Sequence, residues 1–135
     1  MPALLNLVAA SGAPGLRAAF ADAGLDGIRP AQAVALVPLA AGGLHASDLA
    51  DRLKVSRQAV AQVVAVLERH DYVMRGPHPT DARARIIELT LRGRQALRVM
   101  RSHALALEKQ WQKTLGEKRF EELRETLVEL LSADS

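Results

Sequence analysis

The sequence predicts a mainly α-helical fold, a winged helix-turn-helix with a small β-hairpin wing and with N- and C-terminal dimerisation helices. Three neighbouring patterns predict it: a compact amphipathic helix over 47–53, a helix with a bare polar face after Ser56, and a basic hairpin before a long helix. We expect one domain overall, with a dimerisation region at 1–29, a winged region at 30–90 and dimerisation helices at 91–135. Its 135 residues, 49% of them hydrophobic, suffice for a core.

The helix after Ser56 has the pattern of a helix that reads DNA. The Ser56 hydroxyl can accept a backbone N–H of the first turn, which predicts that the helix begins at Arg57. The buried stripe is expected at Val60, Val63, Val64 and Leu67. In the major groove Arg pairs with guanine and Gln with adenine, so Arg57, Gln58 and Gln62 are candidate base contacts. An ordinary amphipathic helix with a solvated polar face is the alternative interpretation.

The preceding helix favours the DNA-reading interpretation. Only Lys54 and Val55 separate residues 47–53 from the cap at Ser56. Two helices joined so closely must cross steeply, as they do in a helix-turn-helix.

Residues 72–89 predict a β-hairpin with a basic tip. Two short apolar-rich runs, 72–75 and 86–89, flank a loop with two prolines. Asp81 stands two residues before Arg83, where a carboxylate can orient a guanidinium for the narrow minor groove. The alternative is that Asp81 and Arg83 only staple the turn, and both roles can hold together.

Charge is concentrated in the same region. Residues 54–103 carry a net charge of +6, although the whole chain carries only +3. This positive segment is the electrostatic footprint expected for phosphates, with Arg75 and Arg92 as candidate phosphate contacts. The low aromatic content of 3% argues against a stacking platform for single strands, so double-stranded DNA is the expected partner.

Three segments carry a family resemblance: 48–50, 56–60, and a wing motif in which Asp-x-Arg at 81–83 precedes Leu-Thr-x-x-Gly at 89–93. In them the chain closely resembles the MarR family of bacterial transcriptional regulators. The resemblance implies a homodimer that binds a palindromic operator, acts as a repressor, and is released by a small-molecule effector or an oxidant. It also implies roles for single residues. Major-groove contacts would be Ser56, Arg57, Gln58 and Gln62, and wing contacts would be Arg83, held by Asp81, with Arg85 nearby.

The chain departs from the family pattern at several positions. Lys54 and Asp71 stand where the family often has Gly, so both are expected at left-handed helix ends. Ala82 replaces a polar or basic wing residue, which leaves the wing contact to Arg83 and Arg85. Pro14 is expected to break the N-terminal helix. The chain has no cysteine, so a thiol switch is excluded.

The terminal helices carry apolar stripes that predict association. The stripes comprise Leu4, Leu5, Leu7 and Val8, then Leu97, Met100, Ala104, Leu107 and Trp111, and finally Phe120, Leu123, Leu127, Leu130 and Leu131. Burial against a symmetric partner would remove them from water, and a homodimer is therefore expected. The alternative is that these helices fold back on the winged region.

Catalysis has little support in the sequence. Ser102 and His103 are neighbours on a predicted helix, where adjacent side chains point in different directions. A metal site built from His70 and His78 with Asp71 or Asp81 lacks repeated ligand spacing. We therefore expect no enzyme, no metal and no cofactor. The resemblance would place an effector pocket between the dimer helices and the winged region, but effector-binding residues remain unknown.

The first residues predict a cytoplasmic location. The N-terminus lacks a basic leader, and its apolar run is expected to be too short and too interrupted to span a bilayer.

The function predicted from the sequence is a sequence-specific, duplex-binding transcriptional regulator. The alternative is a winged-helix protein–protein interaction module without specific DNA recognition. The wing at 81–85 and the polar face of the helix after Ser56 favour the regulator.

Overall fold

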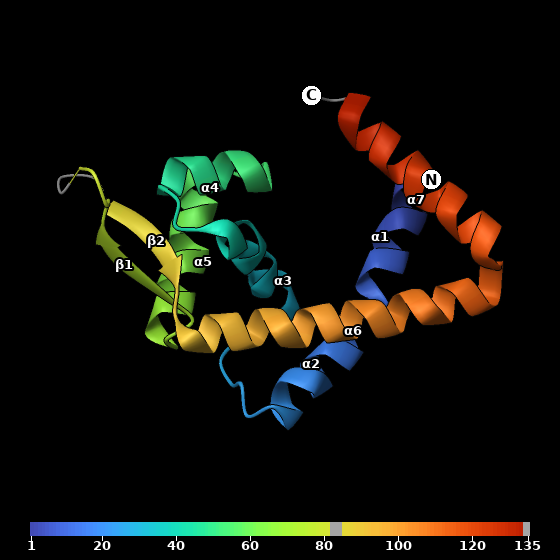
Figure 1. Ribbon diagram of the computed structural model, residues 1–135, viewed down its shortest axis with the longest axis horizontal. Coiled ribbons are helices and arrows are strands. Elements are labelled where there is room, and N and C mark those ends of the chain that lie inside the picture. Colours follow the sequence, from blue (N-terminus) through green and yellow to red (C-terminus); the bar gives the residue numbers. More distant parts are fainter. Residues whose placement is uncertain (82–84, 134–135) are drawn as a thin grey trace. The chain divides into compact units, whose positions relative to one another are not determined.

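The computed structural model describes residues 1–81 and 85–133, and it confirms a mainly helical chain with one antiparallel hairpin (Figure 1). Contacts divide the chain into two compact units, residues 1–101 and residues from 102 onward. The elements are α1 (Pro2–Ala10), α2 (Ala13–Asp22), α3 (Pro30–Ala33), the 3-10 helix η1 (Val34–Ala41), α4 (Ala46–Leu53), α5 (Arg57–Arg69), β1 (Val73–Pro77), β2 (Arg85–Leu89), α6 (Leu91–Leu115) and α7 (Glu117–Ala133).

The helix-turn-helix consists of α4 and α5, and α4 crosses the N-terminal end of α5 (Figure 1). Lys54 ends α4 with φ 56° and ψ 44°, and Asp71 follows α5 with φ 65°. Both are the left-handed positions expected from the sequence. A residue in this conformation changes the direction of the chain at a single position, so each helix can end without a long connecting loop.

The wing is a two-stranded antiparallel ribbon that is tied to the helix-turn-helix. Its register pairs Val73 with Leu89 and Pro77 with Arg85. Leu44, which precedes α4, forms an isolated bridge with Ile87 through backbone bonds of 3.0 and 2.8 Å. The segment before α4 therefore acts as a short third strand, which the sequence pattern did not predict.

The core of the first unit joins η1, α4, α5, the hairpin and the start of α6. Its largest fully buried side chains are Tyr72, Phe20, Leu36, Leu39, Leu49, Leu67, Val60 and Val64. Ala96 is fully buried as well, and Leu97 and Met100 of α6 pack against this cluster. Leu97 and Met100 were expected on a stripe left for a partner, but the winged region covers them in part.

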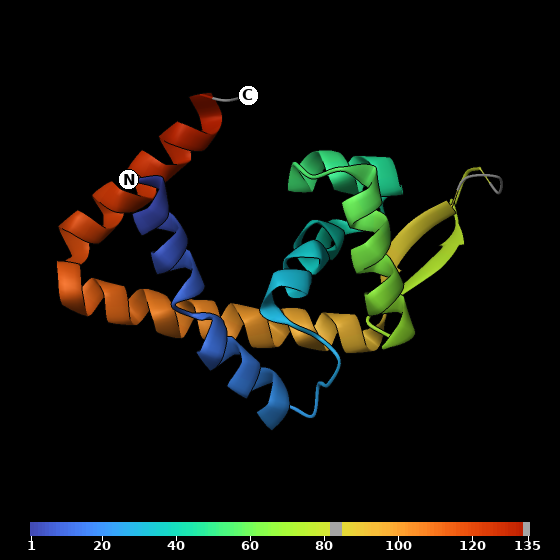
Figure 2. The same ribbon diagram turned by 180° about the vertical axis from the view of Figure 1, so that it is seen from behind.

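The N-terminal helix is divided, as expected, although the break precedes Pro14. α1 ends at Ala10 and α2 begins at Ala13, and the two helices meet at an angle (Figures 1 and 2). Pro14 lies in the first turn of α2, where its missing N–H removes no helical hydrogen bond. The break therefore falls at Ser11 and Gly12.

The apolar stretch at the N-terminus extends over Pro2–Asp22 and is longer than the run that was expected to be too short to span a bilayer. It has 21 residues and contains an 18-residue window with a mean hydropathy of 1.2, so by length and composition it could cross a membrane. The core helix of a soluble protein and an N-terminal signal sequence meet the same measure, and this stretch is bent between α1 and α2. All of α1 is exposed in the single chain.

The C-terminal helices begin and end near their expected limits. The Thr90 hydroxyl accepts the Gly93 N–H at 3.0 Å and so caps α6, which runs to Leu115. Phe120 of α7 is buried, which differs from its expected exposure. Other apolar side chains of α7 are exposed, namely Leu123, Leu127, Val128, Leu130 and Leu131.

Candidate nucleic-acid interface

The N-terminal turn of α5 has the geometry predicted from the sequence. Ser56 is extended, with φ −70° and ψ 157°, and its Oγ accepts the Ala59 N–H at 3.0 Å. This bond satisfies one of the amide groups that a helix start leaves without a partner. It also holds the first turn in place, where the candidate base contacts lie.

The two faces of α5 differ sharply in burial. Val60, Val64 and Leu67 are buried in the core. The side chains of Arg57, Gln58 and Gln62 are exposed, and Ala61 and Ala65 lie exposed beside them. Gln58 and Gln62 are one turn apart, so they share a face. A helix anchored by its valines thus presents guanidinium and amide groups beside small alanines, which is the surface needed to approach base edges.

Removing the Ser56 cap is expected to lower the stability of the fold while the candidate base contacts of α5 stay in place. Ser56→Ala should lower the free energy of unfolding by about 1 kcal/mol, because the Ala59 N–H loses its acceptor. Urea unfolding followed by circular dichroism measures the change. Ser132→Ala is the matched control, since that hydroxyl donates to the Val128 carbonyl oxygen within exposed α7 and caps no helix. Equal stability of Ser56→Ala and the wild type would contradict the capping role.

The wing residues fall partly within the described chain. Asp81 and Arg85 are exposed, and Arg85 begins β2. The predicted tip contact, Arg83, lies outside the described residues. Both residues therefore lie toward the loop of the hairpin, opposite the end where Val73 pairs with Leu89, and the orientation of Arg83 by Asp81 stays a prediction.

Two histidines connect the loop end of the wing strands to the start of α4. His45 Nδ1 donates to the Arg85 carbonyl oxygen at 3.0 Å, and its ring stacks on His78 with 5.6 Å between centroids and 4° between planes. His78 Nδ1 in turn accepts the Thr80 N–H at 3.1 Å. No local sequence pattern predicts this contact, because 33 positions separate the two histidines.

Arg75 remains on the surface. Its Nε lies 3.5 Å from Glu68 Oε2, and both side chains are about 40% exposed, at 41% and 43%. An exposed ion pair of this kind contributes little to stability, so Arg75 can readily leave Glu68 for another anion. The assignment of Arg75 to a phosphate stays a prediction.

Arg92 has partners inside the chain. Its guanidinium pairs with the Asp26 carboxylate, and its Cζ lies 4.7 Å from the centroid of the Tyr72 ring. The Tyr72 hydroxyl donates to the Asp26 carbonyl oxygen at 2.5 Å, and burial raises the pKa of that hydroxyl, an effect that Arg92 partly opposes. Arg92 therefore ties α6 to the segment after α2, and its assignment to a phosphate stays a prediction.

The histidines proposed as metal ligands have separate environments. The His70 ring lies against Gly27, where an added Cβ would come within 2.3 Å of it. His78 instead stacks on His45. Within residues 1–81 and 85–133, no group of three His, Cys, Asp or Glu side chains is arranged to hold a metal ion.

Comparisons with known proteins agree with this geometry. The model of the MarR family matches residues 26–84. No curated protein sequence matches the chain. A probable transcriptional regulator from Pseudomonas aeruginosa is 26% identical, with 94% of this chain and 93% of that chain covered and a TM-score of 0.71.

Two further solved structures have the same fold. The MepR–DNA complex from S. aureus is 22% identical, with 98% of this chain and 97% of that chain covered and a TM-score of 0.77. The PcaV transcriptional regulator from Streptomyces coelicolor, in complex with its natural ligand, is 20% identical, with coverages of 82% and 79% and a TM-score of 0.65. The similarity extends over nearly the whole chain in the first case, terminal helices included.

Proposed function

Since the winged part of this chain, residues 26–84, is of the MarR family, we propose that the protein is a sequence-specific regulator of transcription that binds double-stranded DNA. The observation that carries the proposal is the exposed polar face at the start of α5. Arg57, Gln58 and Gln62 project there from a helix whose other face is fixed in the core. Ser56, at the cap, is assigned a contact in the same groove.

The wing supplies the second contact in this proposal. Asp81, in the loop of the wing, and Arg85, at the loop end of β2, are exposed, and Arg83 is assigned the minor-groove contact at the tip. Arg75 is assigned to a neighbouring phosphate. In this proposal the reading helix contacts base edges, and the wing contacts the minor groove, whose width depends on the DNA sequence. The specificity therefore has two sources.

We further propose that the regulator binds a palindrome as a homodimer and represses its target. Homodimers and repressors are typical of the family. The exposed apolar side chains of α1 and α7 supply a surface for a second copy. Two reading helices related by a two-fold axis would contact half-sites about 10 base pairs apart.

Release by a small-molecule effector belongs to the same proposal. It is supported by PcaV, which shares the fold and was solved with its natural ligand. We assign no effector-binding residues in the terminal helices. Regulation of this kind needs binding alone, without a catalytic step, and would take place in the cytoplasm with the DNA.

Selection of bound duplexes from a random DNA pool tests the proposed function. The purified protein is mixed with the pool at near-physiological salt, and retained duplexes are sequenced. We expect enrichment of a palindrome with half-site centres about 10 base pairs apart. Recovery of unselected sequence, with binding lost as salt rises, would overturn specific recognition and favour the interaction module.

Gln58→Ala is expected to change specificity at one position of each half-site. Loss of a bidentate contact should reduce discrimination there by about 1–3 kcal/mol and leave other positions unchanged. Titration of duplexes that carry single base changes measures the effect. Gln112→Ala, at an exposed glutamine of α6, is the matched control. A uniform loss on every duplex would remove Gln58 from the base contacts.

A further inference from the structure

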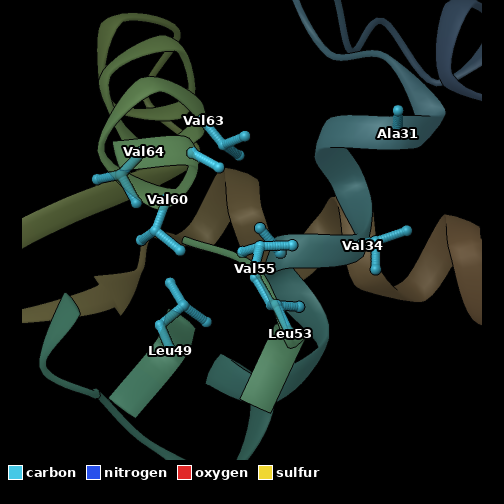
Figure 3. Close-up of a pocket in the computed structure, with 10 residues that line it drawn as sticks. Ala31, Val34, Leu49, Leu53, Val55, Val60, Val63 and Val64 are labelled. Carbon is cyan, nitrogen blue, oxygen red and sulfur yellow. The ribbon is translucent and has the colours of Figure 1, made fainter. Parts of the chain in front are cut away.

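A partly open cavity of about 150 Å³ lies inside the helix-turn-helix (Figure 3). Figure 3 shows its walls coming from three directions: Val60, Val63 and Val64 from α5, Leu49 and Leu53 from α4, and Ala31 and Val34 from α3 and η1. Val55, in the turn between α4 and α5, lies among them. The cavity therefore separates the inner face of α5 from η1 and from α4.

The chemistry of the lining is uniform. All ten lining residues are Ala, Val or Leu. A trapped water needs two to four polar partners, so this lining favours a dry interior over a hydrated one. An ionised ligand would lose its hydration here without a compensating partner, which excludes carboxylates and ammonium groups from the interior.

The cavity follows from the short side chains at this junction. Ala35 of η1 and Val60 of α5 are both buried, and neither is long enough to close the space between their helices. At the rim, Val34 and Val55 are 53% and 46% exposed. Exposed valines at the mouth extend the apolar surface outward and give an apolar molecule a path into the interior.

We propose that this cavity binds an uncharged, hydrocarbon-like molecule about the size of one aromatic ring. The size argument comes from the volume, because an engineered apolar cavity of about 150 Å³ is known to stay dry and to bind benzene. The lining supplies dispersion contacts on several sides, and the absence of hydrogen-bonding requirements selects against polar ligands of equal size.

The site is separate from the effector pocket that the family resemblance implies. All ten lining residues lie between Ala31 and Val64, within the helix-turn-helix and the elements that support it. The implied pocket would lie between the dimer helices and the winged region. The two sites would therefore respond to different substitutions.

An occupant would contact the helix that carries the proposed base contacts. Ala59, Val60 and Val63 line the cavity from α5, and Gln58 and Gln62 are exposed on the same helix. A ligand held between α5 and η1 would fix the reading helix at its present distance from its support and would resist an inward shift of α5 on DNA. Its binding should therefore lower DNA affinity, and DNA should lower ligand affinity equally. This coupling rests on the proposed function, whereas the binding site itself does not.

The site is tested with benzene as the probe and the full chain as the target. Methyl NMR spectra are recorded during titration, and thermal unfolding is followed in parallel. We expect saturable shifts of the Val60 and Val64 methyl groups and a rise in Tm, because benzene binds the folded state. Benzoate, which has the same ring and a charge, should give neither. The absence of saturable shifts with benzene would overturn the proposal.

Variants locate the binding. Ala35→Leu should fill the cavity and abolish the benzene shifts, while Ala40→Leu, exposed on the same 3-10 helix, should retain them. Circular dichroism checks that each variant is folded. Ala31→Leu, at an exposed lining position, provides a second test that does not alter the buried core. Benzene binding that survives in a folded Ala35→Leu and in Ala31→Leu would overturn the assignment of the site.

The coupling is measured with a duplex obtained by selection. Saturating benzene is expected to weaken its binding about fivefold, at the low end of couplings between sites, and to have no effect in Ala35→Leu. Unchanged affinity in the wild type would overturn the coupling while the NMR result for the site stands. Failure to select any duplex would overturn the proposed function and leave the benzene titration as an independent result.

Discussion

Gly93→Ala is expected to lower the free energy of unfolding by about 3 kcal/mol, near the upper end of costs for an overpacked core. The Cβ would lie 2.1 Å from the Tyr72 carbonyl oxygen and 3.2 Å from Leu89 Cδ2. The nearer contact is with backbone, which cannot rotate away as a flexible side chain can. Either the start of α6 or the end of the turn after α5 must therefore move.

The size of this effect follows from how α6 begins. The Thr90 N–H donates to the Tyr72 carbonyl oxygen at 3.2 Å, and Thr90 Oγ1 caps α6 by accepting the Gly93 N–H. Only a residue without a side chain lets the first turn lie this close to Tyr72. The glycine of the Leu-Thr-x-x-Gly motif is thus explained by close packing.

Urea unfolding monitored by circular dichroism measures the loss, and Gly76→Ala serves as the matched control. A Cβ at Gly76 meets no atom of the described residues within 4 Å, so its substitution should change stability far less. Similar losses of unfolding free energy in the two variants would contradict the role of the Tyr72 contact. They would mean that any Gly→Ala substitution in this region destabilises the fold to the same extent.

Leu7→Glu combined with Leu130→Glu is expected to convert the proposed dimer into a folded monomer. The two side chains, in α1 and α7, are 68% and 57% exposed in the single chain, so a charge there costs the monomer little. In a dimer the carboxylates would be buried without partners, at a cost of several kcal/mol. Affinity for a palindromic duplex should then fall at least about 100-fold, because the two half-sites are no longer linked.

Sedimentation equilibrium gives the oligomeric state, and titration of the selected duplex gives the affinity. Leu91→Glu is the control, since Leu91 is 85% exposed at the start of α6 and lies outside the predicted stripes. It should leave the dimer intact. A double variant that still sediments as a dimer would contradict the assignment of these faces to the subunit interface.

The sequence predicted the local features of the fold well, because each depends on residues a few positions apart. The cap at Ser56, the left-handed residues Lys54 and Asp71, and the hairpin were all expected and are confirmed. Each arises from one turn of helix or from one reversal of the chain. Such signals can be read without knowledge of the tertiary packing.

Contacts between distant positions could not be predicted in the same way. Local charge predicted a phosphate contact for Arg92, but no local pattern predicted its pairing with Asp26, which lies 66 positions away. The stacking of His45 on His78 also depends on the docking of the wing. The cavity depends on how η1, α4 and α5 meet, and the valine pattern of α5 predicted burial without predicting how completely the space is filled.

The bridge between Leu44 and Ile87 restrains the distance between the two parts of the proposed DNA-binding surface, the wing and the helix-turn-helix. Backbone bonds join β2, which follows the wing tip, with the segment that leads into α4, so the strands of the wing are held at a constant separation from the helix-turn-helix. In the proposed complex, this separation would set the spacing between the major groove that α5 enters and the minor groove that the wing reaches. The protein would therefore discriminate among sequences by their helical twist and groove width, even at base pairs that no side chain reaches.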